Sequence, residues 1–181
     1  GDPPRRGGYG VYYHFDYVGD PRNYKWVNTN QIARVWEQMH LAYESGVDRI
    51  WIVNVGDIKP MEFPVSFFLD YAWNPAALGA DQLPAYTEQW ARQQFGPAHA
   101  AEIAGLLMAY TQYNSRRKPE LLSADTYSLV HFREAERVVA GYDSLAASAR
   151  RLYNSVDPDF RDAFTQLVLH PIAACANLND L

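Results

Sequence analysis

Two short stretches of the sequence carry side chains that can do acid–base chemistry and bind polar ligands. The first holds His14 and Asp16 at the end of an aromatic run, and the second holds Asn54 and Asp57 at the end of a β-branched run. A carboxylate can donate or accept a proton, and an imidazole or an amide can hydrogen-bond a hydroxyl group. His14 and Asp16 are two residues apart, so an extended backbone would point both to one face. The two stretches are therefore candidates for a catalytic or binding site.

These four residues also have structural explanations that need no ligand. Asp16 can simply orient the His14 ring. Asn54 interrupts an apolar run, where its amide costs free energy unless it is hydrogen-bonded. Asp57 follows Gly56 and can form an Asx turn. The sequence leaves both explanations open at each position.

Three further charged residues lie close by in the sequence. Lys59 and Glu62 follow the second stretch and are not on a regular helix, so a surface ion pair is the simplest explanation for them. Glu37 lies inside a predicted amphipathic helix, where a solvated position is the ordinary explanation. Each of the three is nevertheless a cation or carboxylate that a polar substrate could use.

A strand–helix–strand unit is expected to position these residues. The pattern of GVYYHFDYV predicts a strand at Val11–Phe15, and DRIWIVNVGD predicts a second, buried strand. Between them, Thr29 or Asn30 can cap a helix that ends at Gly46 and whose apolar positions keep helical spacing: Ile32, Val35, Trp36, Met39 and Tyr43. Such a crossover makes the two strands parallel, so their carboxyl ends should share one rim, where α/β proteins bind ligands.

The strands of this unit need neighbours, because two parallel strands cannot bury both faces of a sheet. Further strands are therefore expected to precede Gly1. After the second strand, FPVSFFLDYAWNP predicts a helix that Pro75 stops. We expect a first domain over residues 1–75 and a second over residues 76–181.

The second part of the chain shows only helical periodicity from Pro84 onward. The pattern predicts helices over residues 83–95, 98–117, 123–155 and 157–178. Ser123 is expected to cap the third of them, and Asp157 the fourth, with proline at the next position. Pro171 should kink or end the last helix. These features indicate an α-helical bundle.

Composition excludes several classes of function. Sixteen Lys and Arg against 21 Asp and Glu give a net charge of −5, and no basic stripe is present, so nucleic acid is not an expected partner. The longest apolar runs are too short to span a membrane. Cys175 is the single cysteine, which excludes an internal disulfide and a multi-cysteine zinc site. The 13 Tyr and 5 Trp provide flat faces that suit sugar rings as well as protein cores.

Three long stretches resemble the family 115 glycoside hydrolases, the xylan α-glucuronidases. They are GVYYHFDYVGDPRNYKWVNTN, IARVWEQMHLAYESGVDRIWIVNVGDIKPMEFPVSFFLDYAWNP and AYTQYNSRRKPELL. The resemblance implies an α/β plus all-α fold, namely the C-terminal part of a (β/α)8 TIM barrel followed by an α-helical bundle domain. It also implies removal of glucuronic acid or 4-O-methylglucuronic acid side chains from xylan, with inversion and with no metal or organic cofactor.

An inverting glycosidase needs one carboxylic acid to protonate the leaving oxygen and one carboxylate to activate water. Within this chain the candidates for these groups are Asp16, Glu37, Asp57 and Glu62, with acid and base unassigned. The resemblance implies that further acidic residues of the site lie on earlier barrel strands. The substrate, a glucuronoxylan or a uronic-acid-bearing oligosaccharide, also needs cations, amides and aromatic platforms. The candidates for that role are His14, Arg22, Tyr24, Trp26, Asn28, Asn54 and Lys59.

Other functions remain open from the sequence. The same aromatic and amide groups would serve a non-catalytic carbohydrate-binding module, and the helical part could be an interaction domain. A polysaccharide substrate implies a secreted or periplasmic protein, and a homodimer of the full-length protein is an expectation of the same kind. On its own, a chain that holds only part of a barrel is expected to be inactive.

Overall fold

The computed structural model describes residues 3, 5–17 and 26–181. Its sheet has two strands, β1 (Gly10–His14) and β2 (Ile50–Asn54), which pair in parallel. The register places His14 opposite Asn54, the last residues of the two strands. Both predicted strands are therefore confirmed, and their carboxyl ends lie at the same edge of the sheet.

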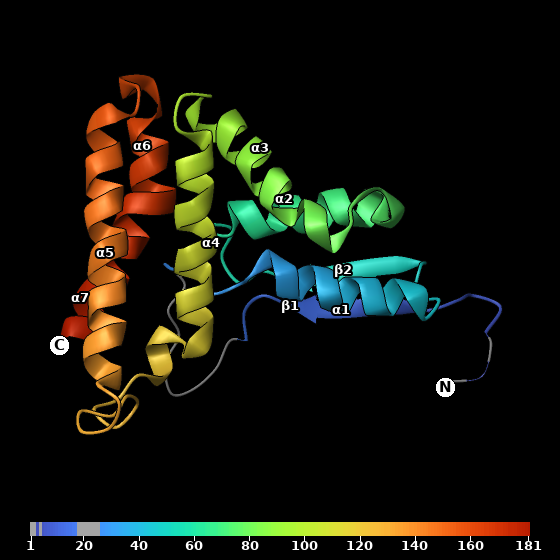
Figure 1. Ribbon diagram of the computed structural model, residues 1–181. Coiled ribbons are helices and arrows are strands. Elements are labelled where there is room, and N and C mark those ends of the chain that lie inside the picture. Colours follow the sequence, from blue (N-terminus) through green and yellow to red (C-terminus); the bar gives the residue numbers. More distant parts are fainter. Residues whose placement is uncertain (1–2, 4, 18–25) are drawn as a thin grey trace.

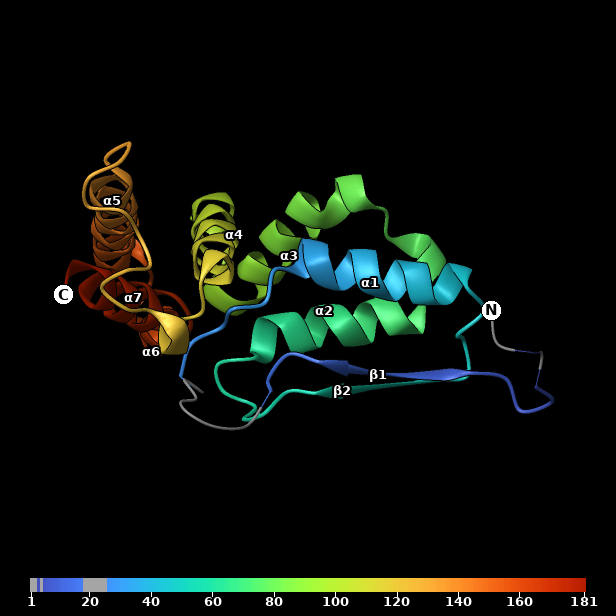
Figure 2. The ribbon, with the colours of Figure 1, turned by 90° about the horizontal axis from the view of Figure 1, so that it is seen from below.

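Helices α1 (Ile32–Glu44) and α2 (Glu62–Trp73) cover one face of this sheet (Figures 1 and 2). On that face, the ring centroids of Tyr13 and Trp51 lie 6.5 and 6.1 Å, respectively, from that of Phe68 in α2. The opposite face has no helix over it (Figure 2), and its apolar side chains Ile50 and Ile52 remain exposed. The sheet is thus buried on one side only within the described chain.

Helix α1 begins without a side-chain cap and ends at a glycine turn. Thr29 and Asn30, the predicted caps, lie before the N-cap position, which Gln31 occupies without a side-chain hydrogen bond. Asn30 instead donates from its backbone to Asn28 Oδ1, which places it in a turn. At the other end the chain reverses at Gly46, which has a φ of +81° and is the residue type that takes this conformation without strain.

The second part of the chain is helical, as predicted, and no strand follows Asn54 in the described residues. Helices α3 (Leu83–Phe95) and α4 (Ala100–Arg116) agree with the predicted segments within two residues. The remaining long helices are α5 (Glu134–Ser155) and α7 (His170–Asp180), and the short α6 (Arg161–Phe164) precedes α7. Single turns of 3-10 helix lie at Pro75–Ala77, Ala80–Gln82, Pro119–Leu121 and Pro158–Phe160.

One predicted helix is wrong over its first turns. Residues 123–133 are not helical, and α5 begins at Glu134. The Ser128 hydroxyl accepts hydrogen bonds from the backbone N–H groups of Val130 and His131, at 3.2 and 2.8 Å. The Glu134 carboxylate accepts another from the backbone of Ser128. These local side-chain bonds compete with helical ones, which is how Ser and Asp-type residues favour turns.

The sequence also predicted a helix cap at Asp157 and a kink or helix end at Pro171. Asp157 caps its turn as predicted, because Oδ1 accepts from the backbone N–H of Asp159 at 3.0 Å. Pro171 does not end the last helix. A π-helical turn, Thr165–Leu169, precedes it, and in this turn the N–H of His170 donates to the carbonyl of Thr165. The wider turn accommodates a residue that lacks the backbone N–H of a regular α-helix.

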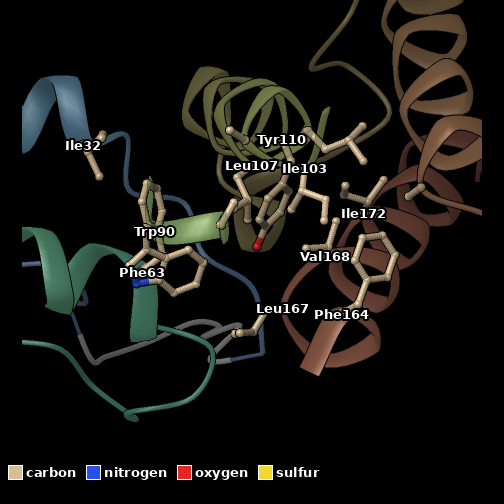
Figure 3. Close-up of a cluster of buried hydrophobic side chains, with 14 of the residues drawn as sticks. Ile32, Phe63, Trp90, Ile103, Leu107, Tyr110, Phe164, Leu167, Val168 and Ile172 are labelled. Atoms are coloured by element: carbon tan, nitrogen blue, oxygen red, sulfur yellow. The ribbon is translucent and has the colours of Figure 1, made fainter. Parts of the chain in front are cut away.

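One continuous core joins the two parts of the chain (Figure 3). Phe63 of α2 packs on Trp90 of α3, with ring centroids 4.9 Å apart. On the bundle side, Ile103 of α4 and Ile172 of α7 are fully buried in the same cluster. The predicted boundary at residue 75 falls just after α2, and apolar contacts run across it. The strand–helix unit is therefore held against the bundle by packed side chains.

Candidate functional site

His14 and Asn54 meet at the carboxyl ends of the two strands. The Asn54 Nδ2 atom lies 3.4 Å from His14 Nδ1, which is also 3.4 Å from the backbone oxygen of Asp16. Asn54 Oδ1 accepts a hydrogen bond from the backbone N–H of Gly56 at 3.0 Å. The Tyr17 ring stacks on His14 with a centroid distance of 4.3 Å. The predicted proximity of His14 and Asn54 is confirmed, and both side chains lie on the open face of the sheet.

Asp16 lies beside the loop that follows β2. A Cβ atom at Gly56 would collide with the Asp16 carboxyl group, so the loop backbone approaches this side chain closely. Gly56 has a φ of +67°, a second reason for glycine at this position. The Oδ2 atom of Asp16 is buried and has no hydrogen-bond partner among the described residues. Asp57 follows in the same turn and is exposed. The two strand ends thus bring Asp16 and the second loop together, as predicted.

Lys59 and Glu62 form the expected ion pair, but a third residue joins them. Lys59 Nζ lies 3.0 Å from Glu62 Oε1 and 2.9 Å from Gln166 Oε1. Gln166 Nε2 in turn donates to Glu62 Oε1 at 3.0 Å. The other oxygen of Glu62, Oε2, is buried without a partner among the described residues. This closed ring of hydrogen bonds links the loop before α2 to the π-helical turn of the bundle.

Glu37 is placed away from these groups. It is exposed on α1 and pairs with Arg34 at 2.5 Å. The hydrogen bond from Arg34 lowers the pKa of the Glu37 carboxyl group, which keeps it ionised and solvated. Glu37 borders a separate hollow of about 700 Å³ between α1 and the bundle, together with Trp36 and Ser115. The structure therefore does not bring Glu37 to the rim.

Asn28 has a structural position. It is 3% exposed, and its Oδ1 atom accepts from the backbone N–H of Asn30 at 2.8 Å. Its own backbone N–H donates to the Tyr110 hydroxyl, and its carbonyl accepts from Asn114 Nδ2 at 3.2 Å. The Asn28 side chain thus bonds Asn30 within its own turn, while helix α4 bonds the peptide groups of Asn28, which must be satisfied because they are buried.

The remaining sugar-binding candidates are only partly described. Trp26 is 37% exposed, and its ring lies 6.2 Å from the ring of His170 in α7. Arg22 and Tyr24 lie outside the described residues. Tyr17 and Gln166 were not predicted from the sequence. The aromatic ring of Tyr17 was visible in the first stretch, whereas nothing in the sequence connects Gln166 with residues more than 100 positions earlier.

Two kinds of feature are absent from the part of the chain that the structure describes. No group of three or more His, Cys, Asp and Glu side chains is arranged to hold a metal ion. No described helix has the length and apolar character needed to cross a membrane.

The comparison with known families decides which class of protein this geometry belongs to. The model of glycosyl hydrolase family 115 matches residues 1–121, the part that contains both strands and the rim. The chain belongs to glycosyl hydrolase family 115. The sequence resemblance to this family is thereby confirmed, and it covers every rim residue except Gln166.

A solved structure of the same family agrees with the fold. It is that of BtGH115A, described as a family GH115 4-O-methyl-α-glucuronidase with specificity for decorated arabinogalactans. The similarity has a TM-score of 0.82 at 29% sequence identity and covers 97% of this chain. This chain corresponds to 25% of the length of that one. No curated protein matches the sequence.

Proposed function

We propose that this family 115 protein is a glycoside hydrolase that removes α-linked glucuronic acid or 4-O-methylglucuronic acid side chains from a polysaccharide. The observation that carries the proposal is the rim itself. In a member of this family, the His14 and Asn54 side chains meet beside the Asp16 carboxylate at the ends of two parallel strands. That edge of a parallel sheet is where barrel enzymes bind their substrates.

The sheet is proposed to be the last part of a (β/α)8 barrel, with residues 76–181 forming a helical bundle domain. The uncovered face supports this arrangement. Tyr12, Ile50 and Ile52 are 58%, 59% and 43% exposed there, while α1 and α2 cover the other face. Parallel sheets are normally buried on both faces, and inward-pointing branched residues fill the interior of a barrel. His14 and Asn54 would lie in the top layer of that interior.

The proposed mechanism is inversion by two carboxyl groups. One protonates the glycosidic oxygen and the other activates water, and the two are typically separated by roughly 6.5–9.5 Å. Asp16 and Glu62 are the best candidates within this chain, because each has one buried carboxylate oxygen without a described partner. Asp57, which is exposed in the turn that follows β2, is the alternative carboxylate. Residues outside this chain can supply further groups.

Lys59 is the cation proposed to bind the carboxylate of the sugar acid. An ammonium group has three N–H donors, and Lys59 uses two of them on Glu62 and Gln166. The third is left for a ligand, and the side chain is 71% exposed. His14 and Asn54 would bind sugar hydroxyls, and Trp26 would provide an apolar platform for the ring.

Two polysaccharides are candidate substrates. The sequence resemblance favours glucuronoxylan, and the named specificity of BtGH115A favours a decorated arabinogalactan. The test incubates the full-length enzyme with oligosaccharides of each kind that carry an α-linked uronic acid. Release of the free uronic acid is followed by chromatography, and the configuration of the first product is read by NMR.

Release with β configuration of the initial product would support an inverting α-glucuronidase. Release with retained α configuration would refute the inverting mechanism. Tight binding to either polysaccharide without any release would favour the alternative, a non-catalytic carbohydrate-binding protein.

Because polysaccharides do not enter cells, we also propose that the protein is secreted or periplasmic. A homodimer of the full-length protein is proposed as well, and its mass in solution tests it.

A further inference from the structure

We propose that Gln166 is a positioning residue of the active site, supplied by the helical bundle to orient Lys59 and Glu62. The inference rests on the proposed function, because it assigns Gln166 a task at the same rim. Gln166 itself lies outside the family match, which ends at residue 121.

The contacts themselves are the first argument. The carboxamide of Gln166 uses both of its ends, accepting from Lys59 Nζ at 2.9 Å through Oε1 and donating to Glu62 Oε1 at 3.0 Å through Nε2. An uncharged amide can accept from an ammonium group and donate to a carboxylate at the same time, which neither a carboxylate nor an ammonium group can do. Because Lys59 and Gln166 both bind Oε1, the second oxygen of Glu62 is fixed in direction and has no partner among the residues that the structure describes.

The backbone around Gln166 is the second argument. The residue lies in the π-helical turn Thr165–Leu169, next to Leu167 and Val168, which are 8% and 0% exposed in the core. A π turn changes the direction of the side chains that follow it, and such turns occur frequently at functional sites. Here the turn keeps Leu167 and Val168 in the core while Gln166 reaches the loop that carries Lys59.

The flexibility of Lys59 is the third argument. Its side chain is 71% exposed, and long exposed lysines lose considerable rotamer entropy when they are held in one place. One ion pair with Glu62 would restrain only one of its N–H groups. The second bond, to Gln166, restrains the ammonium group from another element, so that a substrate carboxylate would meet a cation already in position.

The test uses two variants of Gln166 in the full-length enzyme. Gln166→Met keeps the length of the side chain and removes both hydrogen bonds. Gln166→Glu keeps the acceptor for Lys59 but replaces the donor to Glu62 with a like charge. The matched control is Gln93→Met, at an exposed position of α3. Thermal unfolding of each variant is measured first, to verify that the fold is kept.

We expect Gln166→Met to lower kcat/KM on a glucuronate substrate about ten- to a hundredfold, and Gln166→Glu to lower it further. In a Lys59→Met background the effect of Gln166→Met should be smaller, because one of its two partners is already lost. A second readout needs no activity. Acetylation of Lys59, followed by mass spectrometry, should become faster in Gln166→Met and stay unchanged in Gln93→Met.

Distinct results separate failure of this inference from failure of the proposed function. Unchanged kinetics and unchanged acetylation in a well-folded Gln166→Met variant would overturn the positioning role. Faster acetylation with unchanged kinetics would overturn its catalytic relevance. An inactive wild-type enzyme whose Lys59 still gains reactivity in Gln166→Met would refute the proposed function and keep the placement of Lys59 by Gln166. If Gln166→Met unfolds, the kinetics of Gln166→Glu decide the same question, and unchanged kinetics in that variant would overturn the positioning role.

Discussion

The anchoring of Asn28 to helix α4 gives a prediction that can be worked out from single hydrogen bonds. The Asn28 backbone N–H donates to the hydroxyl of Tyr110, which is 1% exposed. Its carbonyl accepts from Asn114 Nδ2 at 3.2 Å, and Asn114 Oδ1 accepts from the Tyr142 hydroxyl at 2.8 Å. Burial raises the pKa of both tyrosines, so the hydroxyl groups stay neutral at ordinary pH. This network fixes the end of the segment that carries Trp26.

Tyr110→Phe removes the acceptor of the Asn28 N–H and leaves this buried donor unpaired. An unpaired buried donor costs about 1–3 kcal/mol. If that cost destabilises the closed form of residues 26–31 relative to a locally open form, the equilibrium constant for opening rises roughly 5- to 150-fold. The rate of amide exchange at Asn28 then rises by the same factor. Hydrogen–deuterium exchange of the peptide covering residues 26–31, in the intact protein, measures it.

The matched control is Tyr113→Phe, on the same helix. The Tyr113 hydroxyl has no hydrogen-bond partner among the described residues, and its ring packs on Tyr142 at a centroid distance of 5.3 Å. This control should leave exchange at Asn28 unchanged. If Tyr110→Phe also leaves it unchanged, the Asn28 N–H has another acceptor and the anchoring argument is wrong.

Four further predictions concern the rim and the core. In the intact enzyme, Glu62→Gln should lower kcat by about 10²- to 10⁴-fold. Glu37→Gln, which changes an exposed ion pair on α1, should alter kcat less than about threefold. Equal losses of kcat in the two variants would contradict the placement of Glu37. Gly56→Ala should destabilise the protein by about 1–2 kcal/mol in urea unfolding, because φ is +67° and the new methyl group meets Asp16; an unchanged midpoint would show that the loop can move. Burial raises the pKa of the Cys175 thiol from 9.0 to about 11. The neutral thiol therefore stabilises the folded state fully below pH 9.0, and this contribution is lost as the pH rises through 11. Urea unfolding midpoints measured across that pH range should fall accordingly. Iodoacetamide at about pH 8 should react with native Cys175 at least about 100-fold more slowly than with the unfolded chain, and rapid labelling would refute this.

The sequence was sufficient to predict the local elements and the pairing at the rim. The crossover rule makes β1 and β2 parallel, and once they are parallel, residues at their ends must be neighbours. His14 and Asn54 meet for this reason. The helices α3 and α4 were predictable because their apolar residues keep helical spacing and Gly96 and Pro97 separate them.

The errors have a common cause, which is competition from contacts that periodicity does not register. Residues 123–133 have a helical pattern, but the Ser128 hydroxyl satisfies two backbone N–H groups and the chain turns. The anchoring of Asn28 was not predictable either, because α4 supplies partners for its peptide groups from more than 80 residues away. The contacts of Asn28 depend on the packing of distant helices, which local sequence does not specify.

The ring of Lys59, Glu62 and Gln166 shows that the structural and functional explanations of a charged pair need not exclude each other. An exposed ion pair contributes only about 0–1 kcal/mol, and Lys59 is 71% exposed, so stability alone is a weak reason for the arrangement. Pro171 gives an independent reason for the π-helical turn, since it lacks the N–H that a regular helix requires. The turn, once present, places Gln166 against both members of the pair. A backbone adjustment in the bundle thereby sets the direction of a carboxylate at the rim, and the variants of Gln166 test this coupling directly.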